Sequence, residues 1–336
     1  MVLVTGGTGL VGSHLLLQLA KQEENIRALI RKSSSMRNVK LLFEKEADLF
    51  ERIEWMEGDI LDVSSLTDAM QGIEKVYHCA AMISFVPKDR VKMLEINRNG
   101  TANVINLCLE MGVKKLCYAS SVAAINRINE SELITESTAW EENAGNSNYA
   151  VSKQAAEREV WRGIAEGLKA VMVNPGIIIG PGSWNSGSGK LFSSVWEGLK
   201  FYSEGMSGFV SADDVARAMI ALMESEIDAE RFIVVSENLT YREVLFQIAD
   251  SLGKKRPSLK ANKFLSEAAW RLAALASVFS GKTPLITRET AASGLCKVKY
   301  SNEKIRKATG MEFEKIQPVI EHTASVFLKQ HQPVRR

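Results

Sequence analysis

The chain has 336 residues, of which 46% are hydrophobic and 24% charged, and its formal net charge is +2. This composition is ordinary for a globular protein of one large or two medium lobes, and so small a charge favours neither nucleic acid nor an anionic membrane as a partner. The four cysteines include no Cys-x-x-Cys pair and the four histidines lack metal-ligand spacing, so we expect reduced thiols and no metal site.

The first half of the chain alternates short apolar runs with longer helical patterns. Strands are predicted at Val2–Thr5, Ile26–Ile30, Ile53–Glu57, Lys75–Cys79, Lys115–Ser120 and Ala170–Asn174. The intervening helices are predicted from a cap at Ser65 to Gly72, over Val91–Met111 up to Gly112, and from about Tyr149 to Gly167. This alternation predicts an α/β fold with a doubly wound parallel sheet of the Rossmann type, covered by helices on both faces.

After Asn174-Pro175-Gly176 the alternation stops and loop-like glycine and serine runs follow. A helix is predicted at Val215–Glu224, a strand at Arg231–Val235, and a capping box at Thr240 opens a helix over Val244–Leu252. We therefore expect residues 1–175, with 211–235 returning, to form the dinucleotide-binding domain. Residues 176–210 and 236–336 are expected to form a smaller, mainly helical, substrate-binding lobe.

No segment predicts passage through a membrane. The first strand begins at Met1 or Val2, which leaves no room for a signal peptide, and the cytoplasm is the expected location. The apolar segment from Phe264 to Phe279 is interrupted by charges and is too short to span a bilayer of about 30 Å. We interpret it as an amphipathic helix packed on the second lobe, with a peripheral membrane contact as the alternative.

A glycine-rich turn, with Gly6, Gly9 and Gly12, joins the first strand directly to a helix. Glycines let the backbone approach a pyrophosphate closely, and the first-turn amides of Leu10 and Val11 and the helix dipole favour its charge. A tight turn without a ligand is the alternative. The strand–helix context favours dinucleotide binding.

The second strand indicates which nicotinamide cofactor is bound. An NAD site usually has a carboxylate about 20 residues after the glycines, but here the strand ends in Ile30-Arg31-Lys32. The planar guanidinium of Arg31 suits a 2′-phosphate. NADP(H) is therefore favoured and NAD(H) is the alternative. After the third strand, Asp59 and Ile60 are placed to meet the adenine ring, although Asp59 could equally cap the following helix.

Tyr149 and Lys153 are four residues apart on a predicted helix, so they share a face. A free tyrosine has a pKa of about 10, and a neighbouring ammonium group lowers that pKa toward neutrality. The fifth strand ends in Ser120-Ser121, of which Ser121 is the better candidate to hydrogen-bond a substrate oxygen. Turn or helix-cap roles for both serines are the alternative.

Together these residues resemble an extended short-chain dehydrogenase/reductase of the NAD-dependent epimerase/dehydratase superfamily, and the resemblance covers nearly the whole chain. Within it, the chain resembles dihydroflavonol reductases and 3β-hydroxysteroid dehydrogenases. The matching motifs are Thr5-Gly6-x-x-Gly9-x-x-Gly12, Gly58-Asp59, His78-Cys79-Ala80-Ala81, Asn97-x-x-Gly100-Thr101, Ser120-Ser121, Tyr149-x-x-x-Lys153, Asn174-Pro175-Gly176, Gly180-Pro181-Gly182, Asp213-Asp214-Val215-Ala216 and the closing segment from Tyr300 to Gly310.

The resemblance implies a catalytic triad of Ser121, Tyr149 and Lys153. It further implies that the cofactor runs along Ala80 and Ala81, that Pro175 and Ile177 or Ile178 shape the nicotinamide pocket, that Asp214 is structural, and that the chain forms a homodimer. Asn97 is expected to support a structural turn, with binding of a proton-relay water as the alternative.

The predicted function is an NADP(H)-dependent oxidoreductase that interconverts a carbonyl and a secondary alcohol on a small, largely apolar substrate. The loop from Trp184 to Gly205 has only Lys190 and Lys200, and no arginine, to grip a diphosphate. Apolar side chains (Ile83, Phe85, Phe192, Trp196 and Phe209) are expected near the pocket, unless they belong to the core. An NAD-dependent nucleotide-sugar epimerase or dehydratase is the second hypothesis. A non-catalytic, cofactor-sensing protein is the third.

Overall fold

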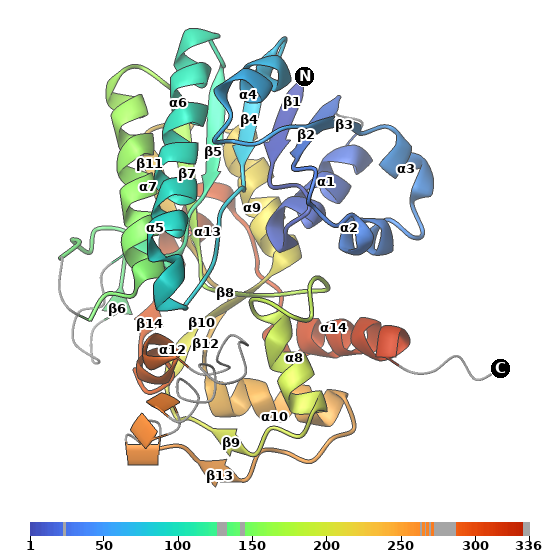
Figure 1. Cartoon of the computed structure of the whole chain (residues 1–336), viewed down its shortest axis with the longest axis vertical. Helices are drawn as coiled ribbons and strands as arrows, with labels where there is room; N and C mark the ends of the chain where they lie inside the picture. Colours follow the sequence, from blue (N-terminus) through green and yellow to red (C-terminus); the bar gives the residue numbers. More distant parts are fainter. Residues whose placement is uncertain are drawn as a thin grey trace.

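The computed structural model describes residues 1–22, 25–125, 133–141, 145–262, 264–265, 267–268, 270–271 and 287–331. Its main feature is a seven-stranded parallel sheet with the strand order β11-β7-β5-β4-β1-β2-β3 (Figure 1). The strands are β1 (Val2–Thr5), β2 (Ile26–Ile30), β3 (Glu54–Glu57), β4 (Lys75–His78), β5 (Lys115–Ala119), β7 (Ala170–Pro175) and β11 (Glu230–Val234). The prediction of a doubly wound α/β sheet is confirmed.

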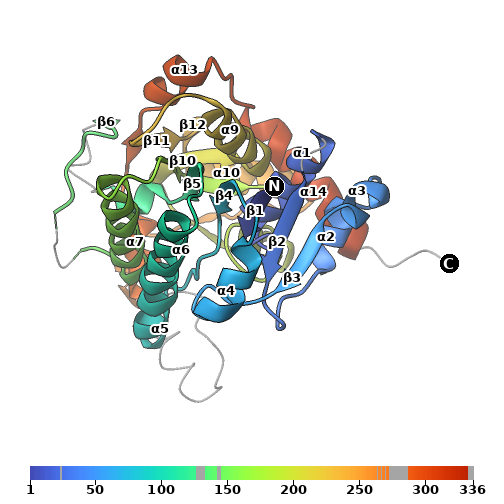
Figure 2. The same ribbon diagram turned by 90° about the horizontal axis from the view of Figure 1, so that it is seen from above.

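Helices cover both faces of this sheet (Figure 2). One face carries α1 (Leu10–Lys21), α2 (Arg37–Leu42), α3 (Ala47–Glu51), α9 (Ala212–Glu224) and α13 (Glu303–Thr309). The other face carries α4 (Val63–Met70), α5 (Arg90–Leu94), α6 (Gly100–Glu110) and α7 (Asn148–Ala165). Successive residues of β1 enter different cores, Leu3 on the α4/α6/α7 side and Val4 on the α1/α9 side, because side chains alternate across a strand.

All six strands predicted in the first half are present within one residue of their expected ends, but two helices differ from the prediction. Helix α4 begins before Ser65, because the side chain of Asp62 accepts a hydrogen bond from Ser64 N at 3.2 Å and caps the first turn. The predicted helix Val91–Met111 is divided into α5, a π-helical turn over Glu95–Asn99, and α6. The turn directs the Asn97 side chain inward.

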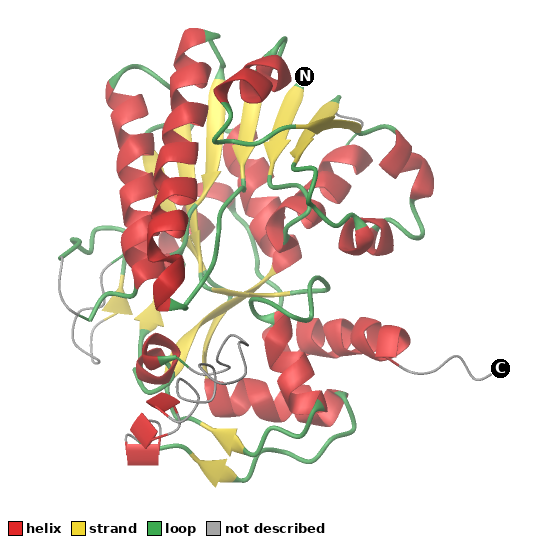
Figure 3. Cartoon of the chain, viewed as in Figure 1, coloured by secondary structure: helices red, strands yellow, loops and turns green. Residues whose placement is uncertain are grey.

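A smaller lobe lies below the carboxyl ends of the strands in the view of Figure 3. Its helices are α8 (Gly189–Trp196), α10 (Tyr241–Ser251), α12 (Arg288–Ser293) and α14 (Ile316–His331). Its short strands, which the sequence did not predict, are β6 (Leu133–Ile134), β8 (Ile177–Ile179), β9 (Phe201–Tyr202), β10 (Met206–Ser211), β12 (Glu237–Thr240), β13 (Leu259–Lys260) and β14 (Lys299–Tyr300). The capping box at Thr240 is confirmed.

The predicted helix from Phe264 to Phe279 lies largely outside the described residues. Within the described part of the chain, no helix has the length and apolar character needed to cross a membrane.

Two adjacent aspartates join α9 to distant segments. The fully buried carboxylate of Asp214 accepts hydrogen bonds from Glu314 N at 2.9 Å and from the Arg217 guanidinium, so its predicted structural role is confirmed. Asp213 bonds to His14 Nδ1 of α1 at 2.8 Å. The Asp213 contact holds α1, the helix that follows the glycine turn, against α9. The Asp214 contact holds the segment just before α14 against α9.

The glycine turn touches the end of β4 directly. Gly6 has a φ of +71°, and a Cβ atom placed at this position would lie 2.6 Å from Ala80 N. Glycine alone satisfies both the left-handed backbone and this close approach.

We predict that Gly6→Ala lowers the free energy of unfolding by about 2–5 kcal/mol, since the new methyl group adds a backbone clash to the left-handed strain. Gly72→Ala is the matched control, because Gly72 has a φ of +73° and a Cβ atom placed there would meet no atom within 4 Å; we expect it to cost about 1–2 kcal/mol. Urea unfolding followed by circular dichroism measures both. Equal losses would show that the contact with Ala80 has no energetic role.

Candidate active site

The strand order reverses between β1 and β4, and in open parallel sheets ligands bind at such a point, outside the carboxyl ends of the strands. The predicted site residues, apart from Tyr149 and Lys153 on α7, lie at or just after strand ends on this edge. Gly6, Gly9, Leu10, Val11 and Gly12 follow β1, Arg31 follows β2, Asp59 and Ile60 follow β3, Ala80 and Ala81 follow β4, Ser121 follows β5, Pro175 ends β7, and Ile177 and Ile178 lie in β8. Folding therefore brings to one edge residues that are far apart in sequence.

Helix α1 begins with free backbone donors. Its N-cap residue, Gly9, provides no side-chain hydrogen bond, and its first turn contains no acidic residue. In contrast, α4, α7, α9 and α10 are each capped by an aspartate, serine or threonine side chain. The first-turn amides of α1 are thus available to an anion such as a pyrophosphate, which fits the predicted cofactor.

The residues predicted to meet the adenosine half of the cofactor have different environments. Arg31 is exposed, and no carboxylate partner is found for it among the described residues. The N-cap residue of α4 is Asp62, so Asp59 does not cap this helix. The carboxylate of Asp59 accepts a hydrogen bond from Leu61 N at 3.0 Å. The Ile60 side chain is 6% exposed and packs against Gly100.

Ser121 and Tyr149 lie together at the edge of the sheet. Their side chains are hydrogen-bonded, and burial raises the pKa of Tyr149 to about 12 while the bond to Ser121 lowers it. Ser121 also accepts a hydrogen bond from Ala123 N at 3.1 Å, so it caps a short 3₁₀ turn in addition to its contact with Tyr149. The neighbouring Ser120 hydroxyl is buried and has no hydrogen-bond partner in the described part of the protein.

Lys153 is 1% exposed, which is unusual for a charged side chain. Its ammonium group donates to the Tyr118 hydroxyl at 2.7 Å and to Ala119 O at 2.8 Å. Burial lowers the pKa of Lys153 to about 7, against the raising effects of Glu157 and Cys79. We expected the ammonium group to lower the pKa of Tyr149 directly. In this structure the ammonium is hydrogen-bonded to β5 instead, and burial is the largest influence on the pKa of Tyr149, which it raises.

A buried acid, which the sequence analysis did not single out, lies one turn beyond Lys153. Glu157 is 2% exposed and accepts hydrogen bonds from Arg231 Nη1 at 3.2 Å and from Asn174 Nδ2. Asn174 also donates to Ser121 O at 2.9 Å. The i, i+4 spacing from Lys153 was the sequence signal for this residue.

Asn97 joins the segment after β4 to helix α7. Its side-chain oxygen accepts from Met82 N at 2.7 Å, and its side-chain nitrogen donates to Met82 O and to Ser152 Oγ, both at 2.9 Å. These bonds give Asn97 a structural role, because they hold the segment after β4 against α7.

Of the apolar residues expected near the pocket, Phe85 is the one whose ring contacts the candidate acid, with its centroid 6.0 Å from that of Tyr149. Phe192 and Phe209 are at most 1% exposed and belong to the core of the smaller lobe, against which Trp196 also packs. For Phe192 and Phe209 the core alternative is correct. Ile83 is 57% exposed.

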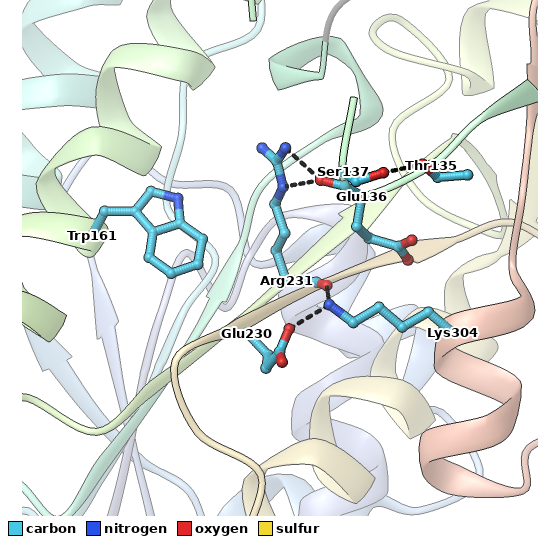
Figure 4. A pocket seen from close by; sticks show the side chains of 7 residues that line it. All are labelled: Thr135, Glu136, Ser137, Trp161, Glu230, Arg231 and Lys304. Carbon is cyan, nitrogen blue, oxygen red and sulfur yellow. Dashed lines mark hydrogen bonds and ion pairs between the residues drawn. The ribbon is translucent and has the colours of Figure 1, made fainter. Parts of the chain in front are cut away.

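A cavity of about 580 Å³ lies away from this edge, beside β11 and α13 (Figure 4). It is lined by Thr135, Glu136, Ser137, Trp161, Glu230, Arg231 and Lys304. Its cations are already paired, Arg231 with Glu157 and Lys304 with Glu230. It contains no predicted site residue, so we do not assign the active site to it.

The fold and these motifs agree with comparisons to known proteins. The profile of the NAD dependent epimerase/dehydratase family matches residues 2–235. A sterol demethylase protein B from Methylococcus capsulatus is 29% identical over 259 residues, 76% of each chain. A putative dihydroflavonol 4-reductase from Synechocystis is 30% identical over 268 residues, 76% of this chain and 73% of the relative. The crystal structure of gox2253 has a TM-score of 0.82 at 28% identity, with 98% of both chains covered.

The chain belongs to the NAD-dependent epimerase/dehydratase family. The predictions of this family and of an enzyme of the short-chain dehydrogenase/reductase type are confirmed.

We predict that His78 makes the fold sensitive to acid. Burial lowers its pKa from 6.5 to about 3, so between these values the unfolded chain binds more protons, and the free energy of unfolding falls as the pH falls from 6.5 toward 3. His78→Gln should reduce this slope by up to about 1.4 kcal/mol per pH unit. Urea unfolding between pH 7.5 and 4.5 measures it, with the exposed His322→Gln as control. Parallel wild-type and His78→Gln curves would contradict the prediction.

Proposed function

We propose that this enzyme is an NADP(H)-dependent oxidoreductase that interconverts a carbonyl and a secondary alcohol on a small, largely apolar substrate. The observation that carries the proposal is the hydrogen-bonded pair of Ser121 and Tyr149, beside the buried Lys153, at the carboxyl edge of the sheet. A phenol and a hydroxyl held at this edge can both contact one substrate oxygen.

The dinucleotide is proposed to lie across the carboxyl edge. The uncapped first turn of α1 would hold its pyrophosphate, and Ala80 and Ala81 would lie along it. Pro175, Ile177 and Ile178 would line the nicotinamide end. When bound, the nicotinamide supplies or accepts the hydride. In this proposal, residues 1–175 and 211–235 hold the cofactor, and residues 176–210 and 236–336 enclose the substrate.

Tyr149 is the proposed proton donor. Because its pKa is raised to about 12, the phenol is protonated at neutral pH and is ready to donate its proton to a carbonyl oxygen as negative charge develops there. Ser121 donates a second hydrogen bond to the same oxygen and stabilises that charge. The positive charge of Lys153 favours the phenolate that remains after transfer, and its free proton can orient a ribose hydroxyl.

Several features support an apolar substrate. The Phe85 ring lies against Tyr149, and the loop from Trp184 to Gly205 carries only Lys190 and Lys200 as cations. The relatives named above include a sterol demethylase protein and a putative dihydroflavonol 4-reductase, so sterol-like and flavonoid-like ketones are reasonable first substrates to assay. The active form is proposed to be a homodimer.

A second candidate is an epimerase or dehydratase acting on a nucleotide sugar with retained NAD, because the family includes such enzymes. The two functions differ in cofactor turnover. An oxidoreductase consumes NADPH in proportion to product, whereas an epimerase is purified with tightly bound NAD and consumes none.

Replacing Tyr149 with Phe should lower the turnover number by about 10²–10⁴-fold, because the ring stays but the proton donor is lost. The affinity for NADPH, measured by fluorescence titration, should stay within about twofold of wild type. Turnover is followed by NADPH absorbance with a panel of sterol, flavonoid and aromatic ketones. Near-native turnover in the variant would refute the proposed role of Tyr149.

Arg31→Ala should weaken NADPH binding by about 10–100-fold and leave NADH binding unchanged, because the lost hydrogen bonds reach only the 2′-phosphate. Isothermal titration with each cofactor measures the effect. Lys21→Ala, which removes a cation at the far end of α1, is the control. A wild-type protein that binds NADH as tightly as NADPH would overturn the preference for NADP(H).

A further inference from the structure

A set of fully buried polar side chains lies between the glycine-rich turn and Lys153. Thr5 ends β1, His78 ends β4, Thr101 belongs to α6 and Tyr118 to β5, and each is at most 1% exposed. Thr5, His78 and Thr101 are joined by hydrogen bonds, and the Tyr118 ring is stacked on His78. Water does not reach these groups, so the direction of the hydrogen bonds from Thr5 to Thr101 can be deduced from their donors and acceptors.

Thr101 fixes the direction of the chain of hydrogen bonds. Its hydroxyl oxygen lies 2.6 Å from Asn97 O and 3.0 Å from His78 Nε2. A carbonyl can only accept, so the single hydrogen of Thr101 points to Asn97. The Thr101 oxygen must then accept from His78.

This assignment determines the tautomer of His78. Burial lowers its pKa to about 3, so the ring is neutral and carries one hydrogen, which the contact with Thr101 places on Nε2. Nδ1 is then an acceptor and receives the hydroxyl hydrogen of Thr5 at 2.7 Å. Thr5 in turn accepts from Ala80 N at 3.3 Å. The chain thus ends at a residue proposed to lie along the cofactor.

Tyr118 connects this network to the ammonium group through its ring and its hydroxyl. The hydroxyl oxygen accepts a hydrogen bond from Lys153 Nζ at 2.7 Å. The Tyr118 ring is stacked on His78, with a centroid distance of 5.4 Å and an interplanar angle of 28°, which restricts its movement. Lys153 Nζ also lies 4.3 Å from the centre of this ring. Tyr118 therefore offers the ammonium both an oxygen acceptor and a π face.

We propose that Tyr118 is a positioning residue for Lys153. Its hydroxyl, carried on a ring that is stacked against His78, accepts a hydrogen bond from the ammonium group and holds it in the charged form at the end of β5. The importance of Lys153 for turnover rests on the proposed function, whereas the order of the hydrogen bonds does not.

Several ionisable groups surround this ammonium. They are His78 and Cys79 at the end of β4, Tyr118 of β5, and Tyr149 and Glu157 of α7. Among them, Glu157 favours the charged form of Lys153 through its own charge, and Tyr118 favours it through a direct hydrogen bond. Loss of that bond should lower the pKa of Lys153 further, while Glu157 remains.

The tautomer can be measured on the unmodified protein. The chain has four histidines, so long-range ¹⁵N–¹H spectra will be simple, and His78→Gln identifies the signal of interest. We expect the Nε2–H pattern at pH 7.5. An Nδ1–H pattern, or a protonated ring, would overturn this order of hydrogen bonds.

The role of Tyr118 is tested with Tyr118→Phe, which keeps the ring and removes the oxygen. The ¹³Cε shift of Lys153, assigned with Lys153→Met, reports its protonation; we expect the midpoint to fall by about one pH unit. Tyr77→Phe, the same change in a fully buried tyrosine of β4 in the opposite core, should leave it unchanged. An unchanged midpoint in Tyr118→Phe would refute the positioning role.

If Tyr118→Phe does not fold, Tyr118→Met serves instead, because it also removes the oxygen acceptor and its flexible apolar side chain can refill the core. The Lys153 midpoint should then fall by a similar amount; no change overturns the proposal. NADPH consumption separates the two hypotheses. If the wild type turns over no substrate, the proposed function is refuted, and the NMR spectra still decide the positioning role of Tyr118. If turnover is normal but the Lys153 midpoint does not shift in Tyr118→Phe, the positioning role alone is refuted.

Discussion

The burial of the Lys153 ammonium group constrains much of this structure. A charge that is 1% exposed is strongly disfavoured unless polar partners replace water. Here the partners come from two elements, the Tyr118 hydroxyl and Ala119 O from β5 and the Glu157 carboxylate from α7. The end of β5 and the first half of α7 must therefore stay in contact, and this contact also brings Ser121 to Tyr149.

The same region is connected to the glycine-rich turn through hydrogen bonds rather than apolar packing. Thr5 and His78 join the ends of β1 and β4, and Asn97 joins the segment after β4 to α7. Polar groups buried in this way are satisfied in few arrangements, so they specify the relative positions of the strand ends. The turn that is proposed to hold a pyrophosphate and the helix that carries Tyr149 thus belong to one connected network.

The smaller lobe has a different organisation. Its core contains Phe192, Phe209 and Phe327, and its short sheet pairs β8 with β10 directly after the end of β7. This pairing fixes Ile177 and Ile178 close to the carboxyl edge of the large sheet. Phe192, Phe209 and Phe327 are committed to the packing of this lobe, since each is at most 1% exposed.

The sequence by itself determined the parallel sheet, the glycine turn, and the pairing of Tyr149 with Lys153 on one helix face. These features depend on local periodicity and short spacing, which a single segment encodes. Tertiary structure alone decided that Lys153 bonds to Tyr118, that Glu157 pairs with Arg231, and that Phe192 and Phe209 are core. Those outcomes depend on which side chains meet across strands and helices far apart in the chain, and on how completely that meeting excludes water.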